Sequence, residues 1–94
     1  MHRIRLGPPW EVTQEPDDRM RHVRRFGRPR TVDPGERVWL VAEVPSDAEV
    51  LLNGATIALP ADVTEQLQPR NELVVIAAAA PQNVALEIVA APSA

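Results

Sequence analysis

Residues 48–59 read AEVLLNGATIAL and place an Asn-Gly pair, Asn53 and Gly54, between two runs of strand-forming residues. Both central residues of a two-residue type I′ turn need a positive φ, which asparagine and glycine adopt with the least strain. The stretch therefore predicts a β-hairpin whose turn is Asn53-Gly54.

Three further strands are predicted around this hairpin. Residues 36–44 (ERVWLVAEV) are apolar on both faces through their middle, which is typical of a central strand. Residues 72–78 are almost wholly apolar, so both faces of that strand should be covered. Residues 84–89 are apolar at every second position, which predicts a half-buried strand.

The N-terminal third has a weaker pattern. Residues 2–6 alternate between polar and apolar, which favours a short edge strand with Ile4 and Leu6 facing inward. Residues 15–19 form an acidic turn, and residues 20–28 are predicted to form a strand. Val23 and Phe26 fall on opposite faces of that strand, which requires either a bulge or burial on both sides.

One helical turn is predicted over residues 62–67, because Asp62 stands three residues before Glu65 in the spacing of a capping box. No segment shows a sustained helical period. Six to eight short strands separated by turn residues predict an all-β fold, a compact antiparallel β-sandwich formed by residues 1–94 as one domain. The pattern leaves open whether residues 1–20 and 90–94 join the sandwich.

Composition excludes several classes of protein. The chain has 94 residues, 45% of them hydrophobic, a formal net charge of −3 and no cysteine, which excludes disulfides, thiolate nucleophiles and cysteine-bound zinc. The longest apolar run, residues 73–80, is far shorter than the roughly 20 residues of a membrane-spanning helix, so no membrane partner is expected. The first eight residues lack the apolar stretch of a secretory signal, which predicts a cytoplasmic location for the chain as given.

Four stretches together resemble the N-terminal sugar-binding domain of family 2 glycoside hydrolases. They are residues 36–41 (ERVWLV), 48–54 (AEVLLNG), 62–67 (DVTEQL) and 71–75 (NELVV). Members of that family carry an A-x-V-x-L-N-G hairpin followed by D-V-T-x-x-L and N-x-L-x-V, in this order. Residues 7–10 (GPPW) look like the family's early G-x-W element, and Arg24-Arg25-Phe26 with Pro29 looks like its next strand.

The resemblance implies a jelly-roll sandwich of the galactose-binding-domain type and a carbohydrate ligand. It does not imply hydrolysis, because the catalytic carboxylates of that family lie in a separate barrel domain. This chain is also shortened, since only residues 55–61 separate the Asn-Gly turn from Asp62. A fold shared with an enzyme is no argument for its activity.

The residues offer little for catalysis or metal binding. The aspartates and glutamates are predicted to be turn, cap or outward-facing strand residues. The only histidines and serines are His2, His22, Ser46 and Ser93, and none of them belongs to a nucleophile motif. His22 is predicted to lie on a polar strand face. We expect no catalytic residues, no enzyme activity, no cofactor and no metal ligands; a structural calcium ion would suit a sandwich of this shape, but no loop specifies one.

Charge is uneven along the chain, because residues 1–30 hold eight arginines against four acids. The densest run comprises Arg19, Arg21, Arg24, Arg25, Arg28 and Arg30. Arginine binds phosphate well, so polyanion binding is one reading of this run. Strand alternation would instead split the arginines between two faces, so polyanion binding ranks third among the functions considered and no nucleic-acid partner is expected.

The candidate ligand-binding residues are Trp10, Trp39, Arg28 and Asn53. An indole ring can stack on a sugar, although a tryptophan in the middle of a strand, such as Trp39, is usually part of the core, and Asn53 is chiefly a turn former. The hypothesis is a non-catalytic binding module for carbohydrate. The alternative is a structural or protein-interaction module, including a homo-oligomer whose sheet edges are covered by a second copy. An obligate oligomer should expose an apolar patch, whereas a carbohydrate module should expose Trp10 in a concave site.

Overall fold

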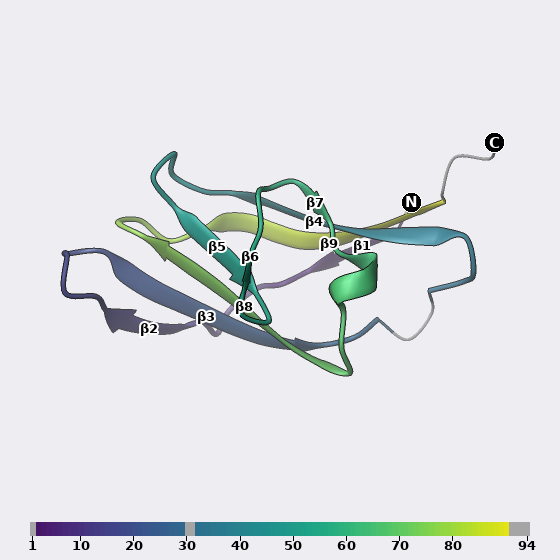
Figure 1. Cartoon of the computed structure of the whole chain (residues 1–94), viewed down its shortest axis with the longest axis horizontal. Coiled ribbons are helices and arrows are strands. Elements are labelled where there is room, and N and C mark those ends of the chain that lie inside the picture. The colour runs from purple at the N-terminus through teal and green to yellow at the C-terminus, as the bar shows by residue number, and fades with distance from the viewer. Residues whose placement is uncertain (1, 30–31, 91–94) are drawn as a thin grey trace.

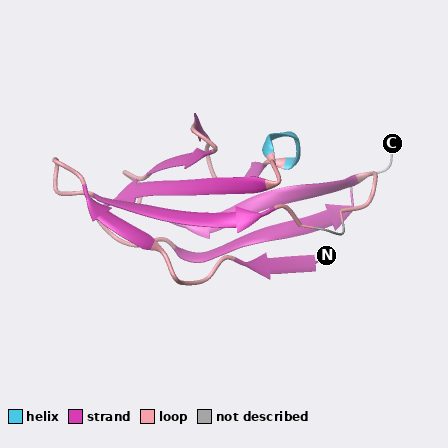
Figure 2. Ribbon diagram, turned by 90° about the horizontal axis from the view of Figure 1, so that it is seen from below, coloured by secondary structure: helices cyan, strands magenta, loops and turns pink. Residues whose placement is uncertain are grey.

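The computed structural model describes residues 2–29 and 32–90 and shows two antiparallel sheets packed face to face (Figures 1 and 2). The elements are β1 (His2–Arg5), β2 (Glu11–Gln14), β3 (Met20–Gly27), β4 (Glu36–Glu43), β5 (Glu49–Leu52), β6 (Ala55–Thr56), β7 (Ala61–Asp62), a 3-10 turn η1 (Thr64–Gln66), β8 (Arg70–Ala77) and β9 (Gln82–Ala90). One sheet has the strand order β1-β9-β4-β7 and the other β2-β3-β8-β5-β6. The predicted β-sandwich is confirmed.

The strand order is that of a jelly roll. With β2 set aside, the eight remaining strands pair from the ends of the chain inward: β1 with β9, β3 with β8, β4 with β7 and β5 with β6. Apart from the β5–β6 hairpin, this nesting sends successive strands of the eight to alternate sheets, and one face of each sheet is buried against the other.

The hairpin forms where the sequence predicts it. Asn53 and Gly54 have φ angles of 52° and 85°, and β5 pairs with β6 across them. The second arm is shorter than its residue types suggest, because β6 ends at Thr56 and only the N–H of Ile57 continues the pairing, at 2.9 Å from the carbonyl of Val50.

Side-chain alternation fills the core as predicted for three strands. The inner faces of β4, β8 and β9 supply its centre, with the residues Val38, Leu40, Leu73, Val75, Ala77, Val84, Leu86 and Ile88. The outer face of β8 is also covered, because Val74 and Ile76 form a second cluster with Val23. Strand β3 therefore needs no bulge: it pairs regularly with β8 from Met20 to Gly27, with Val23 on the outer face and Phe26 against the main core.

Three expectations were wrong. Nine strands form in the described residues rather than six to eight, and β2 and β7 are the two that the sequence did not predict. All four residues of β2 are exposed, and β7 has only two residues, so neither shows an apolar pattern. His22 lies on the inner face of β3, only 4% exposed, with its ring Nδ1 3.0 Å from the carbonyl oxygen of Val75. The helical turn forms without a capping box, because Asp62 accepts its backbone hydrogen bond from Thr64 and Glu65 turns to Arg37.

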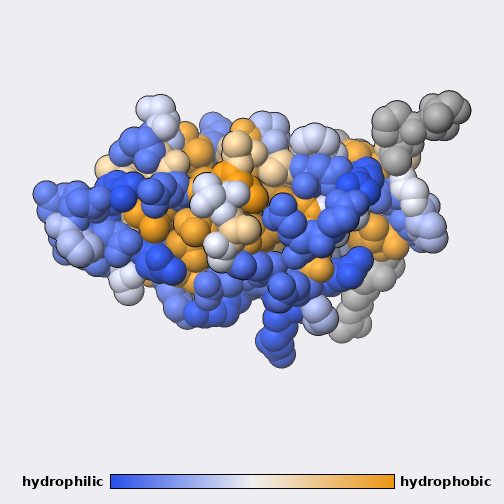
Figure 3. Space-filling view, viewed as in Figure 1, coloured by the Kyte–Doolittle hydropathy of each residue, from blue (hydrophilic) through white to orange (hydrophobic). Residues whose placement is uncertain are grey.

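The two long sides of the sandwich differ. On the side of β6 and β7, the loop between these strands packs Ile57 and Leu59 against the core. Figure 3, in the view of Figure 1, shows hydrophobic residues gathered in the middle of this side and bordered by hydrophilic ones. On the opposite side, β1 ends one sheet while β2 and β3 end the other, and the two sheets part there to form a cavity.

Candidate functional site

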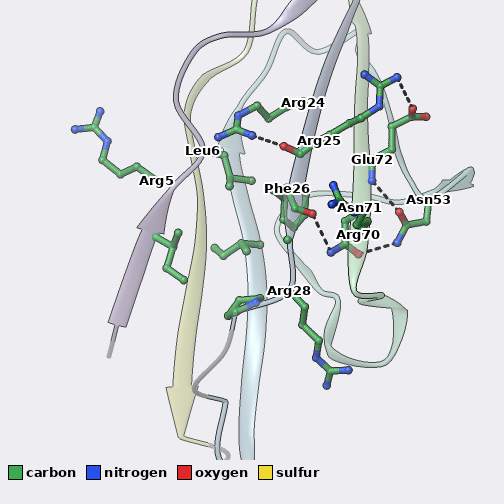
Figure 4. Close-up of a pocket in the computed structure, with 14 residues that line it drawn as sticks. Arg5, Leu6, Arg24, Arg25, Phe26, Arg28, Asn53, Arg70, Asn71 and Glu72 are labelled. Atoms are coloured by element: carbon green, nitrogen blue, oxygen red, sulfur yellow. Dashed lines mark hydrogen bonds and ion pairs between the residues drawn. The ribbon is translucent and has the colours of Figure 1, made fainter.

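A cavity of about 740 Å³ lies between β1 of one sheet and β3 and β8 of the other (Figure 4). We call it the β1–β3 cavity. Its floor is apolar and is made by Ile4, Leu6, Phe26 and Leu86. Its rim carries Arg5, Arg24, Arg25, Arg28 and Arg70, together with Asn53, Asn71 and Glu72.

Arg24 explains why the sheets part at this point. The residue occupies an inward-facing position of β3, two positions before Phe26, where a core side chain would otherwise stand. Its Nε donates to the carbonyl oxygen of Gly7 at 2.8 Å, and its Nη1 donates to the carbonyl oxygen of Arg25. These two bonds use two of the five guanidinium donors, and burial would leave the others without partners, so this end of the sandwich stays open to solvent.

The rim is strongly positive. Five arginines line the cavity and Glu72 is the only acid among its lining residues. Arg25 is ion-paired with Glu72 at 3.2 Å and with Glu11 of β2 at 2.8 Å. Within residues 2–29 and 32–90, the guanidinium groups of Arg5, Arg28 and Arg70 have no carboxylate partner. The side chain of Arg5 points away from the cavity (Figure 4), so Arg28 and Arg70 are the two that we consider available to a ligand.

The side chains of Asn53 and Asn71 hold the start of β8 in place beside the cavity through hydrogen bonds. Asn71 is 3% exposed; its Oδ1 accepts from Asn53 Nδ2 at 3.0 Å and from the N–H of Gln68 at 2.8 Å. Its Nδ2 donates to the carbonyl oxygen of Gln68 at 2.9 Å. Asn53 Nδ2 also donates to the carbonyl oxygen of Gln66, while Asn53 Oδ1 accepts from the N–H of Glu72 at 2.9 Å. Both amides are occupied within the protein, so they shape the cavity wall.

The four candidate ligand-binding residues do not form one site. Arg28 and Asn53 both line the β1–β3 cavity. Trp10 is half-buried against the main core and borders a separate hollow of about 210 Å³. Trp39 is half-buried on the outer face of β4, since its neighbours Val38 and Leu40 face the core. Trp39 therefore lies outside the core, although a tryptophan in the middle of a strand is usually part of it, and it lines neither the β1–β3 cavity nor the hollow beside Trp10.

Comparison with protein-family models, curated proteins and solved structures found no match. The resemblance to the sugar-binding domain therefore stays a prediction. The structure has no helix long and apolar enough to cross a membrane within its described residues. Residues 2–29 and 32–90 also contain no cluster of three or more histidine or carboxylate side chains placed to hold a metal ion.

Sequence reasoning named Arg28 and Asn53 but did not join them with Arg24, Phe26 and Arg70. The dense arginine run was the available signal. As alternation predicts, Arg21 and Arg25 face outward while Arg24 faces inward, and Arg30 lies outside the described residues. Arg70 is distant in sequence and reaches the cavity through the pairing of β8 with β3.

A second charged cluster lies away from the cavity, on β4 and β7. Arg37 Nε donates to Asp62 at 2.8 Å and Arg37 Nη2 donates to Glu65 at 2.7 Å. The hydroxyl of Thr64 donates to Asp62 at 2.6 Å and accepts from the N–H of Val38 at 2.8 Å. The hydrogen bond from Arg37, followed by that from Thr64, lowers the pKa of Asp62 from 3.8 to about 2. The cluster ties η1 and β7 to β4.

This pKa predicts a pH-dependent effect of the substitution Asp62→Asn. A carboxyl whose pKa is lower in the folded state stabilises the fold above its unfolded pKa and loses that contribution as pH falls. Asp62→Asn should therefore lower the free energy of unfolding at pH 7, and the difference from wild type should shrink below about pH 4 and approach zero near pH 2. Urea unfolding across this range measures it.

Asp18→Asn is the matched control, because Asp18 is an exposed turn residue with a φ of 68° that asparagine also adopts. A difference between Asp62→Asn and wild type that stays constant from pH 7 to pH 2 would contradict the role of the Asp62 charge.

Proposed function

We propose that this chain is a non-catalytic binding module whose β1–β3 cavity takes an anionic ligand with an apolar part. The observation that carries the proposal is the lining of the cavity, with five arginines on the rim, one glutamate and an apolar floor. The volume of about 740 Å³ falls within the range of small-ligand sites, roughly 300–1,000 Å³.

The chemistry of the rim favours carboxylate, sulfate or phosphate groups. Guanidinium groups bind these anions through paired hydrogen bonds, and the low polarity of the floor strengthens such bonds. Arg28 and Arg70 are exposed and unpaired with acids of the described chain, so a ligand need not displace an internal partner. The floor accepts the non-polar portion of the ligand.

For a carbohydrate ligand, as the resemblance implies, this lining selects an acidic sugar over a neutral one. Phe26 is the only aromatic residue of the cavity, whereas Trp10 and Trp39 lie elsewhere. Recognition would therefore depend on charge more than on ring stacking. A non-catalytic role is favoured because Glu72 is the single acid of the lining, while glycoside hydrolysis uses two facing carboxylates.

The same lining suits the protein-interaction alternative, with an acidic segment of a partner as the ligand. Obligate self-association through an apolar surface has less support. Val12, 49% exposed, is the one large hydrophobic side chain that stands exposed among residues 2–29 and 32–90. The hydrophobic residues in the middle of the β6–β7 side (Figure 3) include Ile57 and Leu59, which are half-buried against the core and add no fully exposed large side chain to such an interface.

The experiment is a calorimetric titration with a galacturonic acid tetrasaccharide and with its neutral galactose counterpart. We expect saturable binding of the acidic probe only, weakened by salt because charge carries the recognition. The double substitution Arg28→Gln and Arg70→Gln should weaken binding by roughly tenfold per arginine.

The control for this titration is Arg3→Gln, because Arg3 lies on β1 but lines neither cavity. It should leave the affinity within about twofold of wild type. Equal binding of the neutral and acidic probes, or an affinity untouched by the double substitution, would refute the proposed site. If the acidic tetrasaccharide fails to bind but an acidic peptide binds, the ligand class is protein rather than carbohydrate.

A further inference from the structure

The edge of β3 beside the cavity is only partly covered. Strand β2 pairs with β3 from Met20 to Val23, whereas β8 pairs with β3 along its full length to Gly27. Residues 6–10 connect β1 of the other sheet to the start of β2 and form no strand along this edge. Within residues 2–29 and 32–90, no strand pairs with Arg24–Gly27 on the side that faces the cavity.

The pairing pattern shows which backbone groups point to this open side. In an antiparallel strand, the N–H and C=O of one residue point to one neighbour and those of the next residue to the other. The N–H of Arg28 donates to the carbonyl oxygen of Pro69 on the β8 side, so the groups of Phe26 and Arg24 also point to β8. The N–H and C=O groups of Arg25 and Gly27 therefore point to the open side.

One of these groups already has a substitute partner. The guanidinium of Arg24 donates to the carbonyl oxygen of Arg25, on the side where a neighbouring strand would otherwise bind. The N–H of Arg25 and both backbone groups of Gly27 have no backbone partner among the described residues. Unpaired groups at a sheet edge are a template for another strand.

Charge indicates what kind of strand fits. β2, which occupies the first part of the same edge, places Glu11 2.8 Å from Arg25. A strand continuing along this edge would pass Arg28 and Arg70, which have no acidic partner among the described residues, beyond Arg25, which is already paired with Glu11 and Glu72. Every second side chain of such a strand would point to the apolar floor. An extended segment that alternates acidic and apolar residues matches both features.

We infer that an extended acidic segment of a partner protein adds to β3 as a short extra strand beside Arg25 and Gly27. This inference rests on the proposed anion-binding cavity and specifies its occupant. Main-chain hydrogen bonds to Arg25 and Gly27 supply affinity in any such strand addition, while the arginine rim and the apolar floor select alternate side chains.

The test uses the whole chain and three blocked pentapeptides. The first is acetyl-Glu-Val-Glu-Val-Glu-amide, the second has lysine in place of glutamate, and the third is the acidic peptide with its central backbone nitrogens methylated. N-methylation keeps every charge and side chain but prevents strand pairing. We expect the acidic peptide to bind, the lysine peptide not to bind, and the methylated peptide to bind at least roughly tenfold more weakly, the effect of losing a hydrogen bond.

A pair of variants at Gly27 tests the same contact from the protein side. Gly27→Pro removes the N–H that faces the open edge, and Gly27→Ala keeps it. A Cβ at this position meets only the carbonyl oxygen of Pro69, at 3.8 Å, so the Cβ that both variants add has room. The melting temperature of each variant checks that the fold tolerates the proline ring, which also fixes φ. We expect Gly27→Pro to match the loss caused by N-methylation and Gly27→Ala to bind as wild type does. Amide hydrogen exchange at Arg25 and Gly27 should slow when the acidic peptide is bound.

The outcomes separate this inference from the proposed function. Equal binding of the acidic peptide and its methylated form, or binding of the acidic tetrasaccharide without the peptide, would overturn strand addition and leave the anion site standing. Failure of all the anionic probes would overturn both. A dimer in sedimentation that dissociates in Gly27→Pro would assign the edge to a second copy of this chain and overturn the partner segment.

Discussion

Replacing Leu40 with alanine should lower the free energy of unfolding by about 3 kcal/mol, the largest single effect expected in this protein. Leu40 is fully buried in the middle of β4, between Leu86 of β9 and Ala61 of β7. The truncation removes apolar contacts and leaves a cavity that two regular sheets cannot close. The total stability of a domain of this size is about 5–15 kcal/mol, so the loss is a large fraction of it.

Urea unfolding followed by tryptophan fluorescence measures this effect at fixed pH. Val12→Ala is the control, because Val12 also lies on a strand but is 49% exposed, and its truncation should change the free energy of unfolding by less than about 0.5 kcal/mol. A loss below about 1 kcal/mol for Leu40→Ala would mean that the sheets do not pack on this residue.

Replacing Asn71 with alanine should produce the second-largest loss, about 2–3 kcal/mol. The side chain of Asn71 satisfies both the N–H and the carbonyl oxygen of Gln68 and also accepts from Asn53. Removing it leaves the N–H and carbonyl oxygen of Gln68 and the amide of Asn53, all part-buried, without this partner, and it empties the buried position of Asn71 itself. The turn before β8 and the hairpin at Asn53 are held together by this one amide.

The matched control is Gln68→Ala, which removes an exposed side chain but keeps the backbone groups that Asn71 binds. It should leave stability within about 0.5 kcal/mol of wild type. Asn71→Ala should also weaken binding of an acidic probe, because Asn71 and Arg70 stand together at the cavity wall. An Asn71→Ala variant as stable as Gln68→Ala would show that the asparagine pair does not fix this end of the sandwich.

The candidate site was only half predictable, and His22 and Arg24 show the reason. Both are polar residues in an arginine-rich strand, and His22 was accordingly predicted to lie on a polar face. In the structure both lie on the inner face of β3. The ring of His22 is hydrogen-bonded to the carbonyl oxygen of Val75, and the guanidinium of Arg24 donates to the carbonyl oxygens of Gly7 and Arg25. The alternation of side chains along a strand predicts which residues share a face. How much of that face is buried depends on how far the opposite sheet extends over the strand.

The features that depend on local chemistry and on the period of single strands could be predicted from the amino-acid sequence. The positive φ angles at Asn53 and Gly54 set the hairpin, and the apolar runs of β8 and β9 set which residues are buried. The separation of β1 and β3 over an apolar floor, and the presence of Arg70 beside Arg24 and Arg28 there, became visible only in the folded chain. These positions depend on the register between strands that are distant in sequence and on how two twisted sheets overlap, and no local pattern encodes either of them.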